Sequence, residues 1–405
     1  MEPRDYAPAR SSNCSVESLK IALREVFAES IADVHERENT ALVRLLKERG
    51  DRCVLFGAGS MGSRAVTALR SIGVEPLAIS DNNLRLWGTH LLGTPIVSPA
   101  EAVERFGRDA LFFITIRNEL HWYRETHETL TSMGCAHVSS ADPITWRFPE
   151  MFLPFLLYDL PHKVYEQADQ VLQAAELWSD DESRSEFLVQ VRLRALGNPS
   201  GLGKPVPESY ILDGIFELLP SDVLVDCGAY DGDTIREWIR HQPDLGAIEA
   251  VEADTNSFSR LQAFANDLNA HLRNKIRLHQ CALGAEKGKV RFENDGTLVS
   301  KISNRGNTMV DLMPIDDLVE STPISMIKMD IEGGEFDALL GARKVIQRDR
   351  PILAICAYHL QQDLWRLPLL MRSMVPEYRM YLKEYRGDGI QTIVYAVPPE
   401  RLLRE

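Results

Sequence analysis

No apolar run in this 405-residue sequence approaches the roughly 20 residues that a membrane-spanning helix needs. The N-terminus begins with an acidic segment and lacks the basic and then apolar order of a secretory signal. The six cysteines show no Cys-x-x-Cys spacing, and several lie in or beside strand-like apolar runs. We therefore expect a cytoplasmic protein without membrane insertion, whose cysteines are reduced core residues and not metal ligands.

The sequence also has fewer basic than acidic residues. It contains 45 Lys and Arg and 59 Asp and Glu, which gives a formal net charge of -14. A chain of this charge is repelled by nucleic acids and by anionic membrane surfaces. The balance favours a small-molecule or glycan acceptor and no nucleic acid partner. It is compatible with a homo-oligomer but does not specify one.

The length exceeds one ordinary core, so two or three domains are expected. Helical and strand periodicities alternate, which predicts an α/β fold with two Rossmann-like domains. We expect four parts: an N-terminal helical segment (1–50), a Rossmann-like accessory domain (51–150), a helical linker or cap (151–219) and a catalytic domain (220–405).

The first Rossmann-like part contains the pattern Gly57-x-Gly59-x-x-Gly62 after a strand-like run, and Asp81 follows Gly62 by 19 residues. This spacing fits a dinucleotide fingerprint. The same glycines also serve helix packing in Rossmann-like modules that bind nothing, and we prefer that interpretation. An NAD-dependent oxidoreductase and a non-enzymatic scaffold that binds a sugar nucleotide remain alternatives.

A second strand and turn begins with the apolar run 223–226 and continues through Gly228 and Gly232. The two glycines allow a tight turn whose backbone approaches a ligand. Thr234 and Glu237 have the spacing of a capping box, which predicts a helix that starts against the ligand. The turn lacks the Gly-x-Gly-x-x-Gly pattern, so no pyrophosphate is implied.

Acidic residues end two neighbouring runs of the C-terminal domain. Asp226 ends the first run and suits a cationic amino-acid group, whereas Glu252 follows the run 247–251 and can accept two ribose hydroxyls. Together they predict S-adenosylmethionine as the cofactor.

Further polar residues follow the runs 324–329 and 351–357, namely Asp330, Glu332 and His359. Ligands bind beyond the carboxyl ends of parallel strands, so these residues should converge. Methyl transfer to oxygen requires removal of the acceptor's proton, and His359 is our first candidate for the base, with Asp330 orienting it. A divalent cation on Asp330 and Glu332 is an alternative, but too few ligands are identifiable to predict a metal.

With these residues identified, the region from about 205 to 398 resembles the FkbM family of S-adenosylmethionine-dependent methyltransferases. The Lys-x-Asp-x-Glu-Gly-x-Glu segment is the most specific match. The resemblance is carried by the segments 225–234, 251–254, 282–284, 327–335, 339–342, 358–359 and 363–365.

The resemblance implies a class I methyltransferase fold with a mostly parallel seven-stranded sheet, and O-methylation of a hydroxyl on a sugar, glycan precursor or natural product. Ala282 would lie beside the adenine, and Ala253 departs from the Glu-Pro that the family more often has. The N-terminal half resembles a Rossmann-like module found ahead of some FkbM domains. The expected cofactor-binding residues are Asp226, Gly228, Ala229, Tyr230, Gly232, Thr234, Glu252, Ala253 and Ala282. Acceptor specificity is expected in the cap and in the loop from about 296 to 308.

Overall fold

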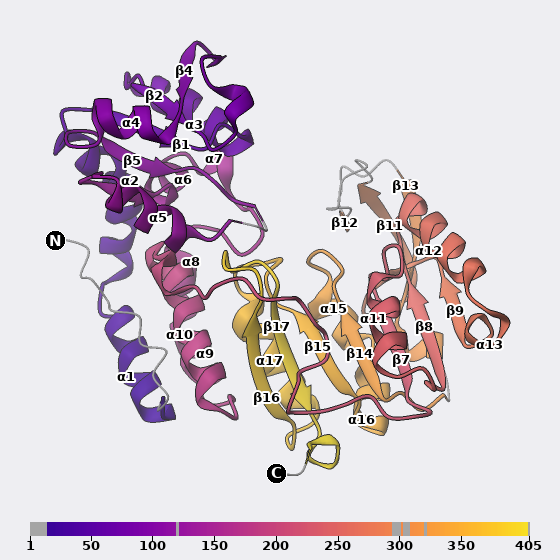
Figure 1. The fold of residues 1–405 in the computed structure, drawn as a ribbon. Coiled ribbons are helices and arrows are strands. Elements are labelled where there is room, and N and C mark those ends of the chain that lie inside the picture. The colour runs from indigo at the N-terminus through magenta and orange to yellow at the C-terminus, as the bar shows by residue number, and fades with distance from the viewer. Residues whose placement is uncertain (1–13, 119–120, 294–300, 303–307, 320–321, 404–405) are drawn as a thin grey trace. The chain divides into compact units, whose positions relative to one another are not determined.

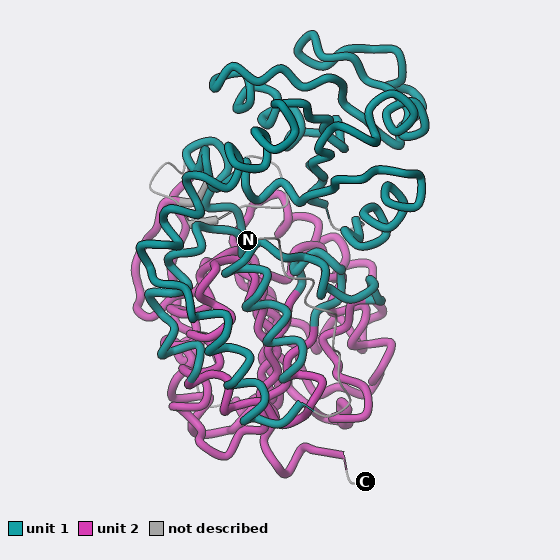
Figure 2. The backbone as a smooth tube through the Cα atoms, turned by 90° about the vertical axis from the view of Figure 1, so that its left-hand side faces the viewer, with its two compact units in different colours: residues 1–172, 184–207, 384–391 teal, residues 173–183, 208–383, 392–405 magenta. Residues whose placement is uncertain are grey.

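The computed structural model describes residues 14–118, 121–293, 301–302, 308–319 and 322–403. They form two compact units, coloured separately in Figure 2. Unit 1 contains residues up to 172 together with 184–207 and 384–391, and unit 2 contains 173–183, 208–383 and 392–405. Each unit therefore includes segments that are distant in the sequence.

The chain up to residue 201 contains mainly helices and short strands (Figure 1). The helices are α1 (Val16–Val26), α2 (Ile31–Lys47), α3 (Ser60–Ser71), α4 (Pro99–Phe106), α5 (Tyr123–Ser132), α6 (Asp142–Arg147), α7 (Pro149–Phe152), α8 (His162–Tyr165), α9 (Ala168–Ala174) and α10 (Asp181–Leu196), with the 3-10 turns η1 (Leu84–Leu86) and η2 (Pro199–Gly201). The strands are β1 (Cys53–Phe56), β2 (Ala78–Ser80), β3 (His90–Leu91), β4 (Thr94–Val97), β5 (Leu111–Ile114) and β6 (Val138–Ser140). Ser15 and Ser30 start α1 and α2 by accepting hydrogen bonds from the backbone N–H groups of Ser18 and Asp33.

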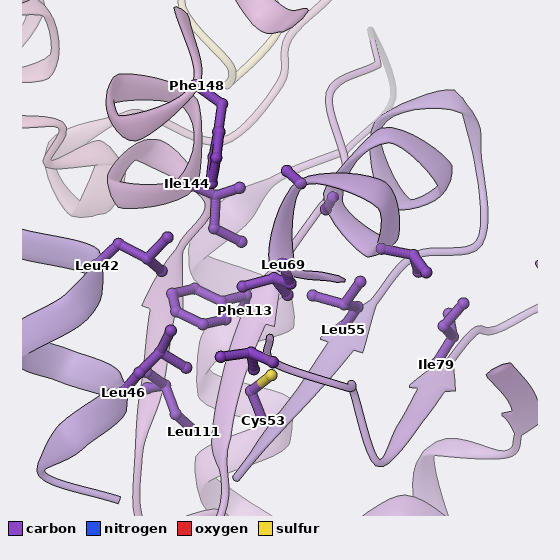
Figure 3. Packing of buried hydrophobic residues seen from close by; sticks show 14 of the residues in the cluster. Leu42, Leu46, Cys53, Leu55, Leu69, Ile79, Leu111, Phe113, Ile144 and Phe148 are labelled. Carbon is purple, nitrogen blue, oxygen red and sulfur yellow. The ribbon is translucent and has the colours of Figure 1, made fainter. Parts of the chain in front are cut away.

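The strands of unit 1 form one six-stranded sheet in the order β3-β4-β2-β1-β5-β6. Its pairings are parallel except for the one between β3 and β4. One face is buried against α2, α3 and α6. In Figure 3 the Phe113 ring of β5 lies among Leu42 and Leu46 of α2 and Leu69 of α3. The first half therefore has an α/β architecture with a mostly parallel sheet, and its assignment as a Rossmann-like accessory domain stays a prediction.

The chain from residue 223 contains the larger sheet and a smaller one. Its helices are α11 (Asp233–His241), α12 (Thr255–Asp267), α13 (Ala270–Arg273), α14 (Ile315–Val319), α15 (Glu335–Leu340), α16 (Arg343–Asp349) and α17 (Asp363–Met374), with the 3-10 turn η3 (Pro399–Arg401). Its strands are β7 (Val223–Cys227), β8 (Ala247–Val251), β9 (Ile276–His279), β10 (Ala282–Leu283), β11 (Gly288–Glu293), β12 (Lys301–Ile302), β13 (Thr308–Met313), β14 (Met326–Met329), β15 (Ile352–Cys356), β16 (Arg379–Glu384) and β17 (Thr392–Val397).

The larger sheet has seven strands in the order β16-β17-β15-β14-β7-β8-β9, side by side in Figure 1. The five strands from β15 to β9 pair in parallel, and β17 runs antiparallel to β15. This is the mostly parallel seven-stranded sheet that the sequence predicts. The central strands β14 and β15 are largely apolar because both of their faces are buried, with Lys328 of β14 as the charged exception.

Two local predictions differ from the structure, and one strand lies where no element is predicted. The segment 282–284 begins with β10, which pairs with β13 in a four-stranded sheet of order β10-β13-β11-β12. The strand β7 continues one residue beyond Asp226, to Cys227. The helical pattern predicted for 151–219 ends earlier, because no helix or strand is assigned in the described segment 202–222. The prolines at 205 and 207 and the glycines at 201 and 203 interrupt any helix there.

All six cysteines are buried and free, as predicted. None of the described helices combines the length and the apolarity that crossing a bilayer requires.

Candidate active site

The carboxyl ends of four adjacent strands in unit 2 carry the polar residues singled out in the sequence. Asp226 lies in β7, Glu252 follows β8, Asp330 follows β14, and His359 lies three residues beyond β15. Parallel register places Asp226 opposite Lys328 of β14 and Cys227 opposite Met329. The alternation of strand and helix thus gathers residues more than 130 positions apart at one edge of the sheet.

The turn after β7 passes directly against the end of β14. Gly228 has a φ of +79°, and a Cβ atom there would lie 1.9 Å from the backbone oxygen of Asp330. Gly232 has a φ of +87°, and its Cβ would lie 2.3 Å from the Phe264 ring. Only glycine satisfies both the backbone conformation and the close approach. The Ala229 side chain between them is buried.

The predicted capping box at the start of α11 is wrong. The N-cap is Gly232, in the left-handed conformation and without a side-chain cap, and Thr234 is a buried residue of the first turn. The Glu237 carboxylate instead accepts a hydrogen bond from the Ser209 hydroxyl, at 2.6 Å. The helix start is thus held by the glycine turn itself, with the Thr234 N–H bonded to the carboxylate of Asp233.

Glu252 fixes the same turn from β8. One carboxylate oxygen accepts the N–H of Tyr230 at 2.9 Å, and the other accepts the N–H of Asp254 at 2.7 Å. Burial raises the pKa of Glu252 to about 6 although these hydrogen bonds favour the charged form. Each carboxylate oxygen retains a second lone pair, so the ribose role predicted for Glu252 is chemically available. Tyr230 itself has a positive φ of 47°.

Asp226 has a different environment from the one predicted. Its side chain is fully buried, and Oδ1 lies 3.0 Å from the Lys328 ammonium, which also donates to the Gly228 carbonyl at 2.8 Å. Burial raises the pKa of Asp226 to about 6. Burial alone would lower the pKa of Lys328, but the charges of Asp226 and Asp330 raise it above its ordinary value. The acid therefore holds the turn through Lys328, and direct contact with an amino-acid group remains a prediction.

Asp330 is the centre of a hydrogen-bond cluster. One carboxylate oxygen accepts the Tyr358 hydroxyl and the other accepts the Tyr210 hydroxyl, both at 3.1 Å. Burial acts to raise the pKa of Asp330, but the hydrogen bond and charge of His359 lower it below its ordinary value. Asp330 is therefore ionised, and its carboxylate contacts Tyr210, Tyr358 and His359.

The His359 ring lies between carboxylates on both sides. Its Nδ1 is 2.8 Å from Glu335, and its Nε2 is 3.2 Å from Asp330 and 3.6 Å from Glu332. Burial acts to lower the pKa of His359, but the Glu335 charge and the Asp330 hydrogen bond raise it well above its ordinary value. The imidazolium form is favoured as long as no ligand separates these groups.

Glu332 and Asp330 are the partly exposed acids of this cluster. Their side chains are 23% and 20% exposed, whereas the His359 ring is 1% exposed. Glu332 also has a φ of 60°, unusual for a residue with a Cβ atom and typical of strained turns at functional sites. The structure thus brings together the predicted residues Asp330, Glu332 and His359, with Glu332 on the side open to solvent.

The site also contains residues to which the sequence analysis assigns no role. Tyr210 comes from the irregular segment before β7 and left no periodic signal, whereas Lys328 was visible in the Lys-x-Asp-x-Glu segment without an assigned role. Glu335, the second glutamate of the Lys-x-Asp-x-Glu-Gly-x-Glu segment, begins α15 and lies 2.8 Å from the Nδ1 of His359. Asp330, Glu335 and His359 also form a group whose donor atoms lie within 4.8 Å of one another, close enough to share a metal ion.

Two further predicted cofactor residues are alanines. Ala253 follows Glu252 and is partly buried, and Ala282 is buried in β10. The predicted specificity loop from about 296 to 308 lies outside the described residues, except for 301–302 and 308.

The glycine pattern of unit 1 is explained by packing. A Cβ at Gly62 would lie 2.0 Å from the backbone oxygen of Gly57. The Asp81 carboxylate is used inside the turn, where it accepts the N–H groups of Ala58 and Asn83, both at 2.7 Å. No specific observation in unit 1 favours a dinucleotide over this structural interpretation.

The chain is similar to one protein family model and to several solved structures. Residues 226–387 match the family model of the methyltransferase FkbM domain. The crystal structure of methyltransferase FkbM from Methylobacillus flagellatus KT covers 94% of this chain and 100% of its own, with a TM-score of 0.75 and 21% identity. At this identity the match shows the fold.

Two other solved structures are more distant. Precorrin-6y C5,15-methyltransferase from Geobacter metallireducens covers 45% of this chain and 83% of its own, with 12% identity and a TM-score of 0.29. A putative methyltransferase from Streptococcus mutans in complex with SAH covers 45% and 89%, with 10% identity and a TM-score of 0.28. No curated protein matches the sequence. The family match and the shared fold identify residues 226–387 as a methyltransferase domain of the FkbM family.

Proposed function

We propose that this protein is an S-adenosylmethionine-dependent O-methyltransferase that acts on a hydroxyl of a sugar, a glycan precursor or a natural product. The observation that carries the proposal is the contact between the Gly228 turn and the Asp330 backbone. This contact places the loop expected to hold the cofactor next to the cluster of Asp330, Glu332 and His359. A methyl donor and a group that accepts a proton would then be neighbours, as O-methylation requires.

The residues of the turn fit the proposed cofactor. Glycines at 228 and 232 leave no side chain between the backbone and a ligand, and Glu252 offers free lone pairs to ribose hydroxyls. In the described part of the chain, Oδ2 of buried Asp226 has no hydrogen-bond partner, while the Lys328 ammonium lies 3.0 Å from Oδ1 and neutralises the carboxylate. When bound, S-adenosylmethionine would supply an activated methyl group on its sulfonium.

The protein's own contribution is to position the acceptor hydroxyl and to receive its proton. In the described arrangement His359 already holds a proton between Asp330 and Glu335, so it can act as the base only after that proton leaves. Glu332, which is more exposed and is adjacent to Nε2, is the alternative proton acceptor. In either case the imidazole and the carboxylates would share the proton taken from the hydroxyl.

The acceptor class rests on the family resemblance and on the net negative charge of the chain. We also propose that the protein is cytoplasmic and does not bind nucleic acid.

Calorimetric titration of the full-length protein with S-adenosylmethionine and, separately, with NAD is the direct test. We expect S-adenosylmethionine to bind, and Glu252→Gln to weaken that binding at least about tenfold, the loss of one charge-assisted pair of hydrogen bonds. Glu286→Gln, an exposed acid after β10, is the matched control and should bind as the wild type does. Binding of NAD alone would refute the proposal and favour an oxidoreductase, whereas binding of neither would favour a scaffold.

Turnover can be tested with a panel of hydroxyl acceptors by following formation of S-adenosylhomocysteine. His359→Gln and Glu332→Gln should retain cofactor affinity and lower turnover. If His359 is the base, the wild-type rate rises as the pH increases through its raised pKa; if Glu332 is the base, that rise is absent.

A further inference from the structure

Unit 1 contains a cluster of histidine and carboxylate side chains outside the proposed active site. His35 and Glu38 lie one turn apart on α2, and His162 is the first residue of α8. The Glu38 Oε2 is 3.0 Å from the Nδ1 of His162 and 3.5 Å from the Nδ1 of His35. One donor atom from each residue lies within 4.8 Å of the other two.

The carboxylate of this cluster is buried. Glu38 is 3% exposed, although it is on a helix whose other faces reach solvent. A buried carboxylate requires a compensating positive charge. In the described part of the chain, the ion-pair partners of Glu38 are the two histidines, which carry charge only when protonated. Their rings lie close together, with centroids 4.2 Å apart, so protonating both would place two positive charges side by side.

A metal ion would compensate Glu38 while both imidazoles remain neutral. Bonds of about 2.0–2.1 Å in a tetrahedron place ligand atoms roughly 3.3–3.4 Å apart. The observed separations of 3.0 and 3.5 Å lie on either side of that value. Two imidazole nitrogens and one carboxylate oxygen form a donor set suited to zinc and related transition metals.

The surroundings also orient the carboxylate for a ligand role. The other oxygen of Glu38, Oε1, accepts the backbone N–H of His162 at 2.7 Å and lies 3.1 Å from its Nδ1, so both oxygens face that imidazole and Oε2 also lies near His35. Such a second hydrogen bond is typical of metal-binding carboxylates. His35 is 48% exposed, so a fourth coordination position can be filled by water.

We propose that His35, Glu38 and His162 bind a divalent transition-metal ion of the zinc type and that this ion links α2 to α8. Glu38 and His162 are 124 residues apart in the sequence, so the ion would close a long loop and stabilise unit 1. The proposal does not depend on the function proposed for unit 2.

The test uses full-length protein that has been stripped with a chelator and then titrated with Zn²⁺, with Co²⁺ as a spectroscopic probe and Mg²⁺ as a hard-cation control. We expect one equivalent of Zn²⁺ to bind and raise the melting temperature, and Co²⁺ to give the visible absorption of a tetrahedral site. His35→Gln removes an exposed ligand and should fold normally, so it should lower Zn²⁺ affinity at least about tenfold. Glu38→Gln and His162→Gln should do the same.

Two control variants make the test decisive. His90→Gln changes an exposed histidine of the same unit and should leave Zn²⁺ binding unchanged. His359→Gln removes a possible ligand of the Asp330 and Glu335 group and should also leave it unchanged. Absence of Zn²⁺ binding would overturn the proposal, as would binding that persists in His35→Gln and His162→Gln or disappears only in His359→Gln.

Discussion

Lys328 and Asp226 form a buried ion pair across two adjacent parallel strands, with 3.0 Å between Nζ and Oδ1 and side chains that are 3% and 0% exposed. The two residues are direct register partners in β14 and β7. Lys328 also donates to the Gly228 carbonyl, so the pair connects the sheet to the turn that we propose holds the cofactor.

Removing one member of this pair should destabilise the protein strongly. We expect Lys328→Met to lower the free energy of unfolding by about 3–5 kcal/mol, because Asp226 is then left buried without a counter-charge. The double variant Asp226→Asn with Lys328→Met should be less destabilised than the sum of the two single variants. Urea denaturation of all four proteins measures this coupling, and strictly additive single effects would show that the pair does not act as a unit.

The Gly228→Ala substitution should disrupt the cofactor turn. The added Cβ would lie 1.9 Å from the Asp330 oxygen, at a φ that disfavours alanine. We expect a loss of S-adenosylmethionine affinity of more than about tenfold, because the turn and the cluster must separate. Gly214→Ala is the matched control, because Gly214 has a φ of +77° and no atom within 4 Å of its Cβ. Equal losses in both variants would indicate that backbone strain alone is responsible.

The raised pKa of His359 makes stability depend on pH. The folded state holds this proton more tightly than the unfolded chain does, in which the histidine pKa is about 6.5. The resulting stabilisation is fully present below that pH and is lost as the pH rises through the folded-state pKa. Wild-type protein should therefore lose its stability advantage over His359→Gln as the pH rises from about 6.5 through the raised folded-state pKa. Urea titrations across this range measure the difference, and an advantage that grows with pH would contradict the ion pairs described for His359.

Alanine substitution in the glycine pattern of unit 1 should destabilise the protein at Gly62 and have little effect at Gly59. Gly62→Ala places a Cβ 2.0 Å from the Gly57 oxygen and should destabilise the protein by at least about 2 kcal/mol. Gly59 has no atom within 4 Å of its Cβ, and its φ is -76°, so Gly59→Ala should cost less than about 1 kcal/mol. Thermal denaturation compares the two. Similar effects at both positions would show that packing does not explain the pattern.

The sequence by itself determined the larger elements of this protein. Largely apolar runs predicted β7, β8, β14 and β15, because strands buried on both faces are rich in apolar residues. The buried residues Asp226, Glu249 and Lys328 interrupt three of these runs. The residues that end or follow these runs were therefore predicted to lie at one edge of the sheet, and Asp330, Glu332 and His359 do lie together there.

Only the tertiary structure decided what those residues contact. Lys328 neutralises Asp226 because the register of two strands that are distant in sequence places them opposite each other, and sequence spacing does not encode register. The Thr234 capping box failed because Gly232, packed against Phe264, supplies the helix start instead. The segment 384–391 belongs to unit 1 although it begins with the last residue of β16 and leads into β17 of the seven-stranded sheet. Each of these facts depends on contacts between residues far apart in the chain, and local patterns of polarity carry no information about such contacts.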